Sequence, residues 1–288
     1  MGRNYYYFVA GLPDLFIDQE RKDFNLLRVK EEAMEFLHPS DYSLVELLYL
    51  TYDNENILNH LLNRKLNFNT LGKFPEEMYE EFEENLNEFP SYVAKFHNFI
   101  KGNQAEDEEQ DEERTLFDSE QTPKNNEVKF YELFYAYINS MGNQFLSNWF
   151  QFLRNFNNIL TAISCRNMGI SSQNQLIGNG VVVEALNRSQ APDFGLKQEV
   201  EYIEALLQIT EVTSIIERER RLDMLKWDMA DEMSTFDYFN INRILAFFIK
   251  AGIVHRWMKL DPKVGAELFQ KLTTELKESY TLPKEFSK

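Results

Sequence analysis

Apolar residues recur three and four positions apart along most of this chain, and this spacing constrains the fold more than any other feature. Tyr42, Val45, Leu48 and Tyr52, for example, fall on one face of a helix. Strand-like alternation is scarce, and 11 glycines and 8 prolines among 288 residues provide few turns. The pattern predicts an all-α fold, a large body of about nine helices joined by short connections.

Capping residues mark where several of these helices begin. Pro39-Ser40-Asp41, Pro75-Glu76-Glu77 and Asp261-Pro262 each combine residues that favour a first helical turn. The charge-rich stretch 199–221 is predicted as a single helix with a solvated face of opposite charges. The stretch 169–180, which is rich in Gly, Ser and Asn, is predicted as an ordered loop between helices.

An acidic segment interrupts the helical pattern. Residues 106–113 hold seven carboxylates in eight positions, and the stretch 102–126 contains little that a core would bury. We predict a flexible surface insertion at 102–126, between helical regions at 1–101 and 127–288 that act as one functional unit. The alternative interpretation is an acidic docking tail for a basic partner.

The net charge limits which partners the chain can bind. Lys and Arg total 30 and Asp and Glu total 47, which gives a formal net charge of −17. A field of this sign repels phosphate backbones and anionic lipids, so we expect no nucleic-acid binding. The first ten residues do not resemble a secretory signal, and the apolar run 244–249 is far shorter than the roughly 20 residues that span a bilayer. We therefore expect a cytoplasmic protein that meets a membrane only through other proteins.

Histidine and cysteine side chains are not spaced for metal binding or catalysis. Cys165 is the only cysteine, so it forms no internal disulfide, and we expect a buried thiol. No two histidines stand one helical turn apart, as a helix-borne zinc pair would. Glu35 and His38 match half of a di-iron Glu-x-x-His pattern, but Pro39 ends the helix there, which favours a surface or capping histidine. The four histidines are His38, His60, His97 and His255.

Nucleotide-binding and nucleophile motifs are also missing from the sequence. Gly178-Asn179-Gly180 leads into Val181 without the preceding strand that a dinucleotide-binding turn requires, and no Gly-x-Ser-x-Gly elbow occurs. We therefore expect no catalytic, cofactor-binding or metal-binding residue. An unrecognised helical enzyme stays open as a third hypothesis. The enzyme hypothesis would be supported by a pocket that gathers two or more of Glu35, His38, His60, His97 and the carboxylates of 199–219.

Two clusters of large apolar residues have two interpretations. They are Trp149-Phe150 with Phe152-Leu153, and Phe247-Phe248. Core packing is the first, and an exposed patch that binds a partner protein is the second.

A faint internal repeat is present in three copies. In each copy an Asn begins the motif, an aliphatic pair follows, and a cation stands eight positions after the Asn. The prediction is that the Asn opens a helix, the aliphatic pair enters the core, and the cation offsets the helix dipole. Coincidence among similar amphipathic helices is the alternative. The copies are Asn56-Ile57-Leu58 with Arg64, Asn158-Ile159-Leu160 with Arg166, and Asn242-Arg243-Ile244-Leu245 with Lys250.

Two segments resemble a known family. The stretch 5–14, Tyr-Tyr-Tyr-Phe-Val-Ala-Gly-Leu-Pro-Asp, resembles the opening of an uncharacterised bacterial family whose genes accompany V/A-type ATPase subunits. The stretch 239–265, with Ile244-Leu245-Ala246-Phe247 and Arg256-Trp257, resembles the ending of that family. The family is in turn similar to the V/A-type ATPase central-axis subunit, called C in prokaryotes and d in eukaryotes.

The resemblance implies a mechanical role without chemistry. The central-axis subunit is an all-helical, funnel-shaped body of three related helical units, and the faint repeat would be their remnant. It links the central shaft to the proteolipid ring, at the inner face of the membrane, in a motor that transports protons or sodium. The family's motifs are structural, so the resemblance carries over no catalytic residue. A cytoplasmic helical scaffold or adaptor unrelated to the ATPase is the alternative function.

Overall fold

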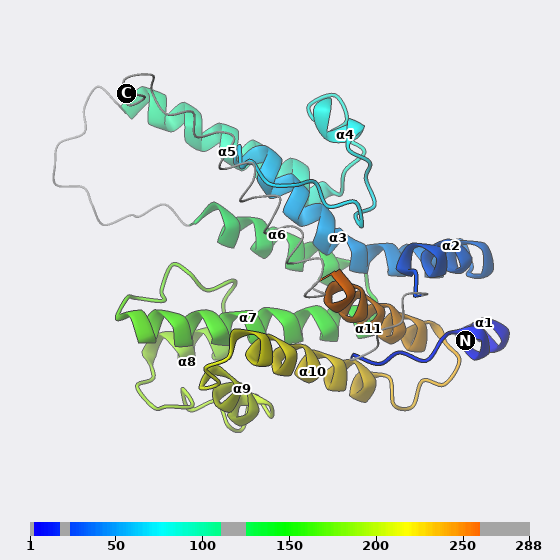
Figure 1. Ribbon diagram of the computed structural model, residues 1–288. Coiled ribbons are helices and arrows are strands. Elements are labelled where there is room, and N and C mark those ends of the chain that lie inside the picture. The colour runs from blue at the N-terminus through cyan, green and yellow to red at the C-terminus, as the bar shows by residue number, and fades with distance from the viewer. Residues whose placement is uncertain (1–2, 18–23, 111–124, 260–288) are drawn as a thin grey trace, which may run out of the picture. The chain divides into compact units, whose positions relative to one another are not determined.

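The computed structural model describes residues 3–17, 24–110 and 125–259, with the backbone alone for 103–110. Within these ranges the chain forms eleven α-helices and no strand, which confirms the all-α prediction (Figure 1). The count exceeds the predicted nine because short helices occur between the long ones. The helices are α1 (Tyr6–Gly11), α2 (Leu26–Phe36), α3 (Pro39–Leu61), α4 (Glu77–Glu80), α5 (Ser91–Gln110), α6 (Asn126–Ser140), α7 (Gln144–Met168), α8 (Val181–Arg188), α9 (Ile203–Thr210), α10 (Ile215–Met233) and α11 (Ile241–Lys259).

The chain divides into two compact units. The first combines residues 1–38 with 236–288, and the second is the continuous stretch 39–235. The predicted division at 102–126 rests on composition and stays a prediction. Helix α5 extends through Gln110 and so continues into the predicted insertion, while residues 111–124 lie outside the described ranges.

The first unit joins the two ends of the sequence. The Tyr5 N–H donates to the Phe239 carbonyl at 2.6 Å, and the Tyr6 and Phe239 rings lie 4.7 Å apart. The Tyr5 hydroxyl accepts a hydrogen bond from the His38 N–H at 3.3 Å. Helix α2 packs against α11 in the same unit. The two segments that carry the family resemblance therefore contact each other, in the parts that the structure describes.

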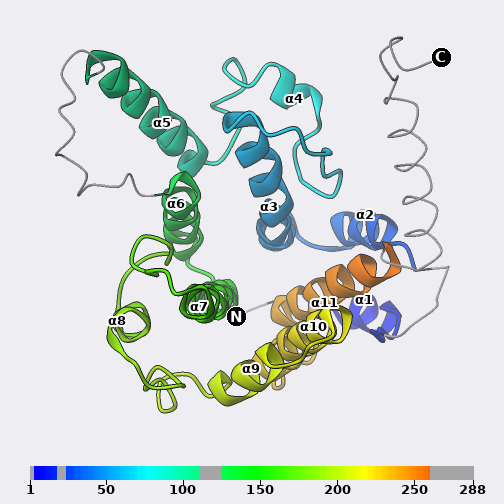
Figure 2. The same cartoon turned by 60° about the vertical axis from the view of Figure 1, so that its left-hand side comes forward.

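The second unit is built around an aromatic core. Helix α6 packs between α5 and α7 (Figure 2), and α7 also contacts α8 and α10. The ring centroids of Phe96 and Phe130 lie 4.9 Å apart, and those of Phe134 and Phe150 lie 5.3 Å apart, both in edge-on geometry. Aromatic pairs prefer this arrangement, so the phenylalanine-rich composition supplies a closely packed interior.

The apolar clusters and the cysteine of the sequence lie in the interior. Trp149, Phe152, Phe247 and Phe248 are all buried, which confirms the core interpretation for these side chains. Cys165 is also buried, near the end of α7, as a free thiol. Among the described residues, no helix has the length and apolar character needed to cross a bilayer.

The predicted helix boundaries agree with the structure at several points. Helix α3 begins at Pro39, and the short α4 follows the predicted Pro75-Glu76-Glu77 start. Helix α7 ends where Gly169 adopts a left-handed conformation (φ 69°), and α8 begins after Gly180, so the predicted loop 169–180 is confirmed. The predicted start at Asp261-Pro262 lies outside the described residues.

The prediction of one helix over 199–221 is wrong. Residues 203–210 form α9, the chain turns at 211–214, and α10 begins at Ile215. The Ser214 hydroxyl accepts the Glu217 N–H at 3.4 Å and caps the new helix. β-Branched Val212 and Thr213 precede this cap, and such residues favour helix less than the surrounding Glu and Leu. The charged face is nevertheless solvated: Glu217 pairs with Arg221 at 2.7 Å, and Glu204 pairs with Lys197.

Candidate functional site

Helix α3 buries several polar side chains along its length. Asp53 and Asn54 are fully buried, Asn56 is 4% exposed and Asn59 is 9% exposed. Burying a polar group is costly unless it forms hydrogen bonds. The partners of Asp53 and Asn56 indicate which segment the helix holds in place.

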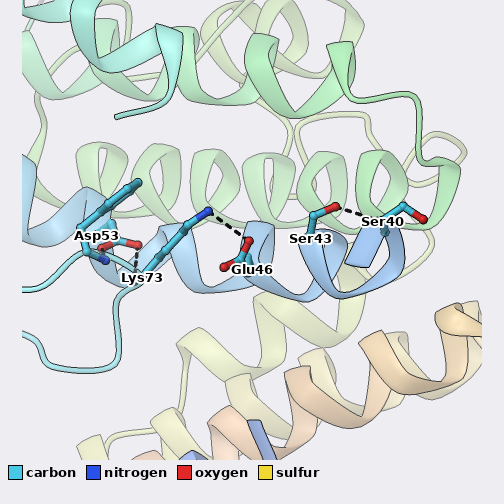
Figure 3. Close-up of polar contacts among 6 residues, drawn as sticks. Ser40, Ser43, Glu46, Asp53 and Lys73 are labelled. Carbon is cyan, nitrogen blue, oxygen red and sulfur yellow. Dashed lines mark hydrogen bonds and ion pairs between the residues drawn. The ribbon is translucent and has the colours of Figure 1, made fainter. Parts of the chain in front are cut away.

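Asp53 binds the loop between α3 and α4, residues 62–76. Its carboxylate accepts hydrogen bonds from the Lys73 N–H at 2.8 Å, the Phe74 N–H at 3.1 Å and the Tyr79 hydroxyl at 3.1 Å. Figure 3 shows Asp53 beside Lys73, whose ammonium group pairs with Glu46 at 3.0 Å. Burial raises the pKa of the Tyr79 hydroxyl, and the neighbouring Asp53 charge raises it further.

The loop backbone approaches Asp53 closely at Gly72. A Cβ built on Gly72 would lie 2.3 Å from the Asp53 Oδ1, well inside any normal contact. Only glycine fits beside the carboxylate without movement of one of them. The absence of a side chain at Gly72 therefore allows the loop to bring its two N–H groups to the buried Asp53 carboxylate.

Asn56 binds the same loop through a peptide group. Its side-chain Nδ2 donates to the Asn69 carbonyl at 3.0 Å, and its Oδ1 accepts the Asn69 N–H at 2.8 Å. The amide thus satisfies both polar groups of one residue, as a neighbouring strand would. We call this two-way contact an asparagine clamp.

A second asparagine clamp occurs in α7. The Asn158 Nδ2 donates to the Ile177 carbonyl at 2.9 Å, and its Oδ1 accepts the Ile177 N–H at 2.8 Å. Asn158 is 1% exposed, and Ile177 belongs to the loop 169–180 that follows its helix. Two copies of the repeat predicted from sequence therefore share one set of contacts.

The role predicted for these asparagines is wrong in both clamps. Asn56 and Asn158 lie inside α3 and α7 and do not open them. Their amides point sideways to a loop, which an N-cap position would not permit. Asn242 lies in the first turn of α11 but does not cap it, because Asn240 Oδ1 accepts the Asn242 N–H at 3.0 Å and the Arg243 N–H at 3.4 Å. The Asn242 Nδ2 donates to Asp237 at 3.0 Å. The aliphatic prediction is confirmed for both members of the pair in the first and third copies, Ile57 with Leu58 and Ile244 with Leu245. In the second copy Ile159 is buried, but Leu160 is only half-buried.

The cations of the repeat stand near their helix ends in the two clamp copies. Arg64, just beyond α3, pairs with Glu127. Arg166, in the last turn of α7, donates to the Ser189 and Ala191 carbonyls at 3.0 Å, and its guanidinium lies 3.7 Å from the Phe194 ring centroid. Lys250 lies inside α11, so the third copy departs from this placement.

A cavity lies beside each clamp in the second unit. The first, about 270 Å³, is lined by Asn56, Asn59, His60, Glu76, Tyr79 and Glu80 among others. The second, about 430 Å³, is lined by Thr51, Tyr131, Asn157, Thr161, Gln175 and Ile177 among others. Both cavities therefore lie where a clamped loop packs against its helix.

Neither of the two cavities gathers two of the residues that the enzyme hypothesis names. Glu35 and His38 are exposed at the end of α2, as predicted for a surface histidine. Buried His97 pairs through Nε2 with Glu83 at 2.8 Å. The pKa of Glu83 is lowered mainly by its hydrogen bond from Lys101, and next by its hydrogen bond with His97. His60 alone of the candidate set lines one of the two cavities. Within the described ranges no three His, Cys, Asp or Glu side chains are grouped to hold a metal.

The sequence interpretation missed three of the buried polar residues of α3. Asp53, Asn54 and Asn59 were not singled out, although the run Asp53-Asn54-Glu55-Asn56 interrupts an apolar helical pattern. Three of these four side chains are buried. A polar run inside an otherwise apolar helical stretch was therefore the signal that could have identified them.

The sequence matches, over residues 2–280, a family described as proteins of unknown function, DUF2764. The chain belongs to this family. Both clamps and both cavities of this DUF2764 chain lie inside the matched range. No curated protein and no solved structure is similar enough to count as a match.

Proposed function

We propose that this DUF2764 protein is a non-catalytic subunit of a V/A-type ATPase that couples the central shaft to the proteolipid ring. The observation that carries the proposal is the asparagine clamp, which occurs in the same form in α3 and α7. A chain with repeated helix–loop units fits the resemblance to the central-axis subunit, which is built from related helical units.

The position of the resembling segments supports the proposal. They stand at opposite ends of the sequence, yet they meet through Tyr5, Tyr6 and Phe239 in one compact unit. Two segments that resemble the same family and contact each other support membership of that family more strongly than two separate segments would.

The packing of the second unit suits the transmission of torque. Protein interiors packed to crystal-like density resist deformation. The rings of Phe96, Phe130, Phe134 and Phe150 fill the space between α5, α6 and α7, and the clamps bind the loops to their helices. This construction favours a stiff mechanical part.

The proposed partners are the shaft subunits and the proteolipid ring, at the cytoplasmic face of the membrane. The net charge of −17 favours basic surfaces on the shaft, because complementary charge speeds and orients association. Contact with the membrane would then occur through the ring. Proton and sodium transport are equally compatible with this role.

Purification of the native assembly tests the proposal. The tagged chain is expressed in its own host, the membranes are solubilised in mild detergent, and the companions are identified by mass spectrometry. We expect head, shaft and ring subunits of a V/A-type ATPase. Recovery with an unrelated set of proteins would instead support the scaffold alternative.

A functional measurement complements this purification. Deletion of the gene should abolish ATP-driven ion transport into membrane vesicles while the soluble head retains ATP hydrolysis, since only the coupling part is lost. Full transport in the deletion strain would refute the coupling role. Restoration by the unmodified chain is the control.

A further inference from the structure

The first cavity, next to the clamp of α3, has the features of a binding site for a polypeptide segment. Its volume of about 270 Å³ is close to the lower end of the roughly 300 to 1,000 Å³ typical of small-molecule pockets. This is space for one residue of a bound chain rather than for a large ligand. Its walls come from α3, the loop 62–76 and α4.

Asn59 in the wall of this cavity has an unused amide. The side chain is 9% exposed and forms no hydrogen bond with any described residue, although buried amides are normally bonded. It stands one helical turn beyond Asn56, whose amide binds a peptide group of the loop. The same donor and acceptor pair is therefore available a second time, facing the cavity.

Two carboxylates without a described cation partner line the cavity. Glu76 and Glu80 line it, both are exposed, and neither pairs with a described cation. Carboxylates four positions apart repel each other. Arg64 also lines the cavity but is paired with Glu127, and burial lowers the pKa of His60, which disfavours its charged form. A cation would relieve this repulsion.

We propose that this cavity binds one residue of an extended segment of a partner protein, with Asn59 binding its peptide group and Glu76 and Glu80 binding its Lys or Arg side chain. The inference does not depend on the proposed function, because it rests on this cavity alone. A peptide is favoured over a free small cation because the unused amide offers one donor and one acceptor, which match the C=O and N–H of a peptide group.

The second cavity provides a natural comparison. The position one turn beyond its clamp is Thr161, and no pair of free glutamates lines it. Thr161 has no amide to bind a peptide group in two directions. The proposal therefore applies to the first cavity and not to the second.

Nuclear magnetic resonance on the full chain tests the proposal. The probe is a blocked Gly-Ser-Arg-Ser-Gly peptide, titrated against ¹⁵N-labelled protein while the Asn59 side-chain amide signal is followed. We expect saturable shifts of this signal and of the Glu76 and Glu80 backbone signals, with a dissociation constant on the order of 1 mM, since only one residue is held. The absence of saturable shifts at these residues would overturn the proposal.

Two site variants, one control variant and two altered probes separate the parts of the site. Glu76→Gln with Glu80→Gln, and separately Asn59→Ala, should each weaken binding roughly tenfold, whereas Thr161→Ala should leave it unchanged. Because Glu76 and Glu80 are both exposed, the melting temperature of the double glutamine variant should match that of the parent chain, which checks that its fold is intact. A peptide in which uncharged citrulline replaces the arginine should bind roughly tenfold more weakly than the arginine peptide. Equal binding of the citrulline and arginine peptides would refute the role of the charge. Agmatine, the arginine side chain with an amine and no peptide group, tests the other part. If agmatine bound as tightly as the peptide, the cavity would be a small-cation site instead.

Discussion

Helix α3 with its loop 62–76 and helix α7 with its loop 169–180 hold their loops through the same asparagine clamp, in surroundings of different charge. The first clamp has a buried carboxylate, Asp53, one turn before it, and this group accepts three hydrogen bonds from the loop and Tyr79. The second has Asn155 at the equivalent position, which is only half-buried. Arg166 instead binds carbonyl groups beyond α8.

The comparison distinguishes the asparagine clamp, which both copies share, from the charged contacts that differ between them. The amide clamp is neutral and recurs, so it defines the repeat. The carboxylate beside the first clamp and the guanidinium beyond the second are additions specific to each copy. Substitutions at matched positions should therefore give equal effects at the clamps and unequal effects around them.

The largest effect is expected for Asp53→Ala. Loss of the carboxylate leaves the Lys73 and Phe74 N–H groups and the Tyr79 hydroxyl without their acceptor, which should lower the free energy of unfolding by about 3 kcal/mol or more. Urea denaturation measures it. Asn155→Ala is the matched control, with an expected loss below about 0.5 kcal/mol. Similar losses in the two variants would mean that Asp53 adds nothing to the first clamp.

Removal of either clamp should cost nearly the same. Asn56→Ala and Asn158→Ala each delete two hydrogen bonds to a loop residue, so each should lower the free energy of unfolding by about 2 kcal/mol. Hydrogen exchange at the Asn69 and Ile177 N–H groups should accelerate only in the variant that lacks the corresponding clamp. A large effect at one site alone would break the equivalence.

Gly72→Ala probes the carboxylate from the loop side. The added Cβ would overlap the Asp53 Oδ1, so we expect a loss of about 1 to 3 kcal/mol in thermal or urea unfolding. Gly102→Ala is a control for which we expect the free energy of unfolding to rise instead of fall. Its Cβ meets nothing within 4 Å inside α5, and it should stabilise by about 0.5 kcal/mol.

The two cations of the repeat should differ in importance. Arg166→Ala removes hydrogen bonds to two carbonyls and the contact with the Phe194 ring, which should cost about 1 kcal/mol. Arg64 is 40% exposed in its pair with Glu127, and Arg64→Ala should cost below about 0.5 kcal/mol. Equal melting temperatures of the two variants would contradict this order.

The smallest effect concerns pH. Burial lowers the pKa of His60 in the folded chain below its ordinary value of 6.5, so the unfolded chain takes up the proton first. The stability that neutral His60 supports is therefore present above that value and is lost as the pH falls through it. Urea midpoints between about pH 7.5 and about pH 5.5 should fall less steeply for His60→Gln than for the parent chain. An identical slope would exclude His60 as the cause.

Much of the fold followed from the sequence because helical periodicity is a local signal. The all-α class, the starts at Pro39 and Pro75 and the loop 169–180 all depend on residues close together in the chain. The break at 211–214 was missed because the flanking charged residues favour helix on both sides, and only the Ser214 cap and the β-branched Val212 and Thr213 act against continuity.

The contacts of the candidate site were only partly predictable. The repeat identified Asn56 and Asn158 correctly as equivalent, but their partners, Asn69 and Ile177, stand 13 and 19 residues further along the chain. Such separations depend on how each loop returns to its helix, and no local pattern encodes that path. The role of Gly72 was likewise invisible, since it follows from the close approach of Asp53.

An amide that binds a peptide group recognises atoms present in every residue type. The two clamps accordingly accept an asparagine at 69 and an isoleucine at 177, in loops of different length. Sequence drift, and even insertions, in these loops can therefore accumulate without loss of anchorage, so a protein built this way can evolve new surfaces at its loops while its helices stay as they are.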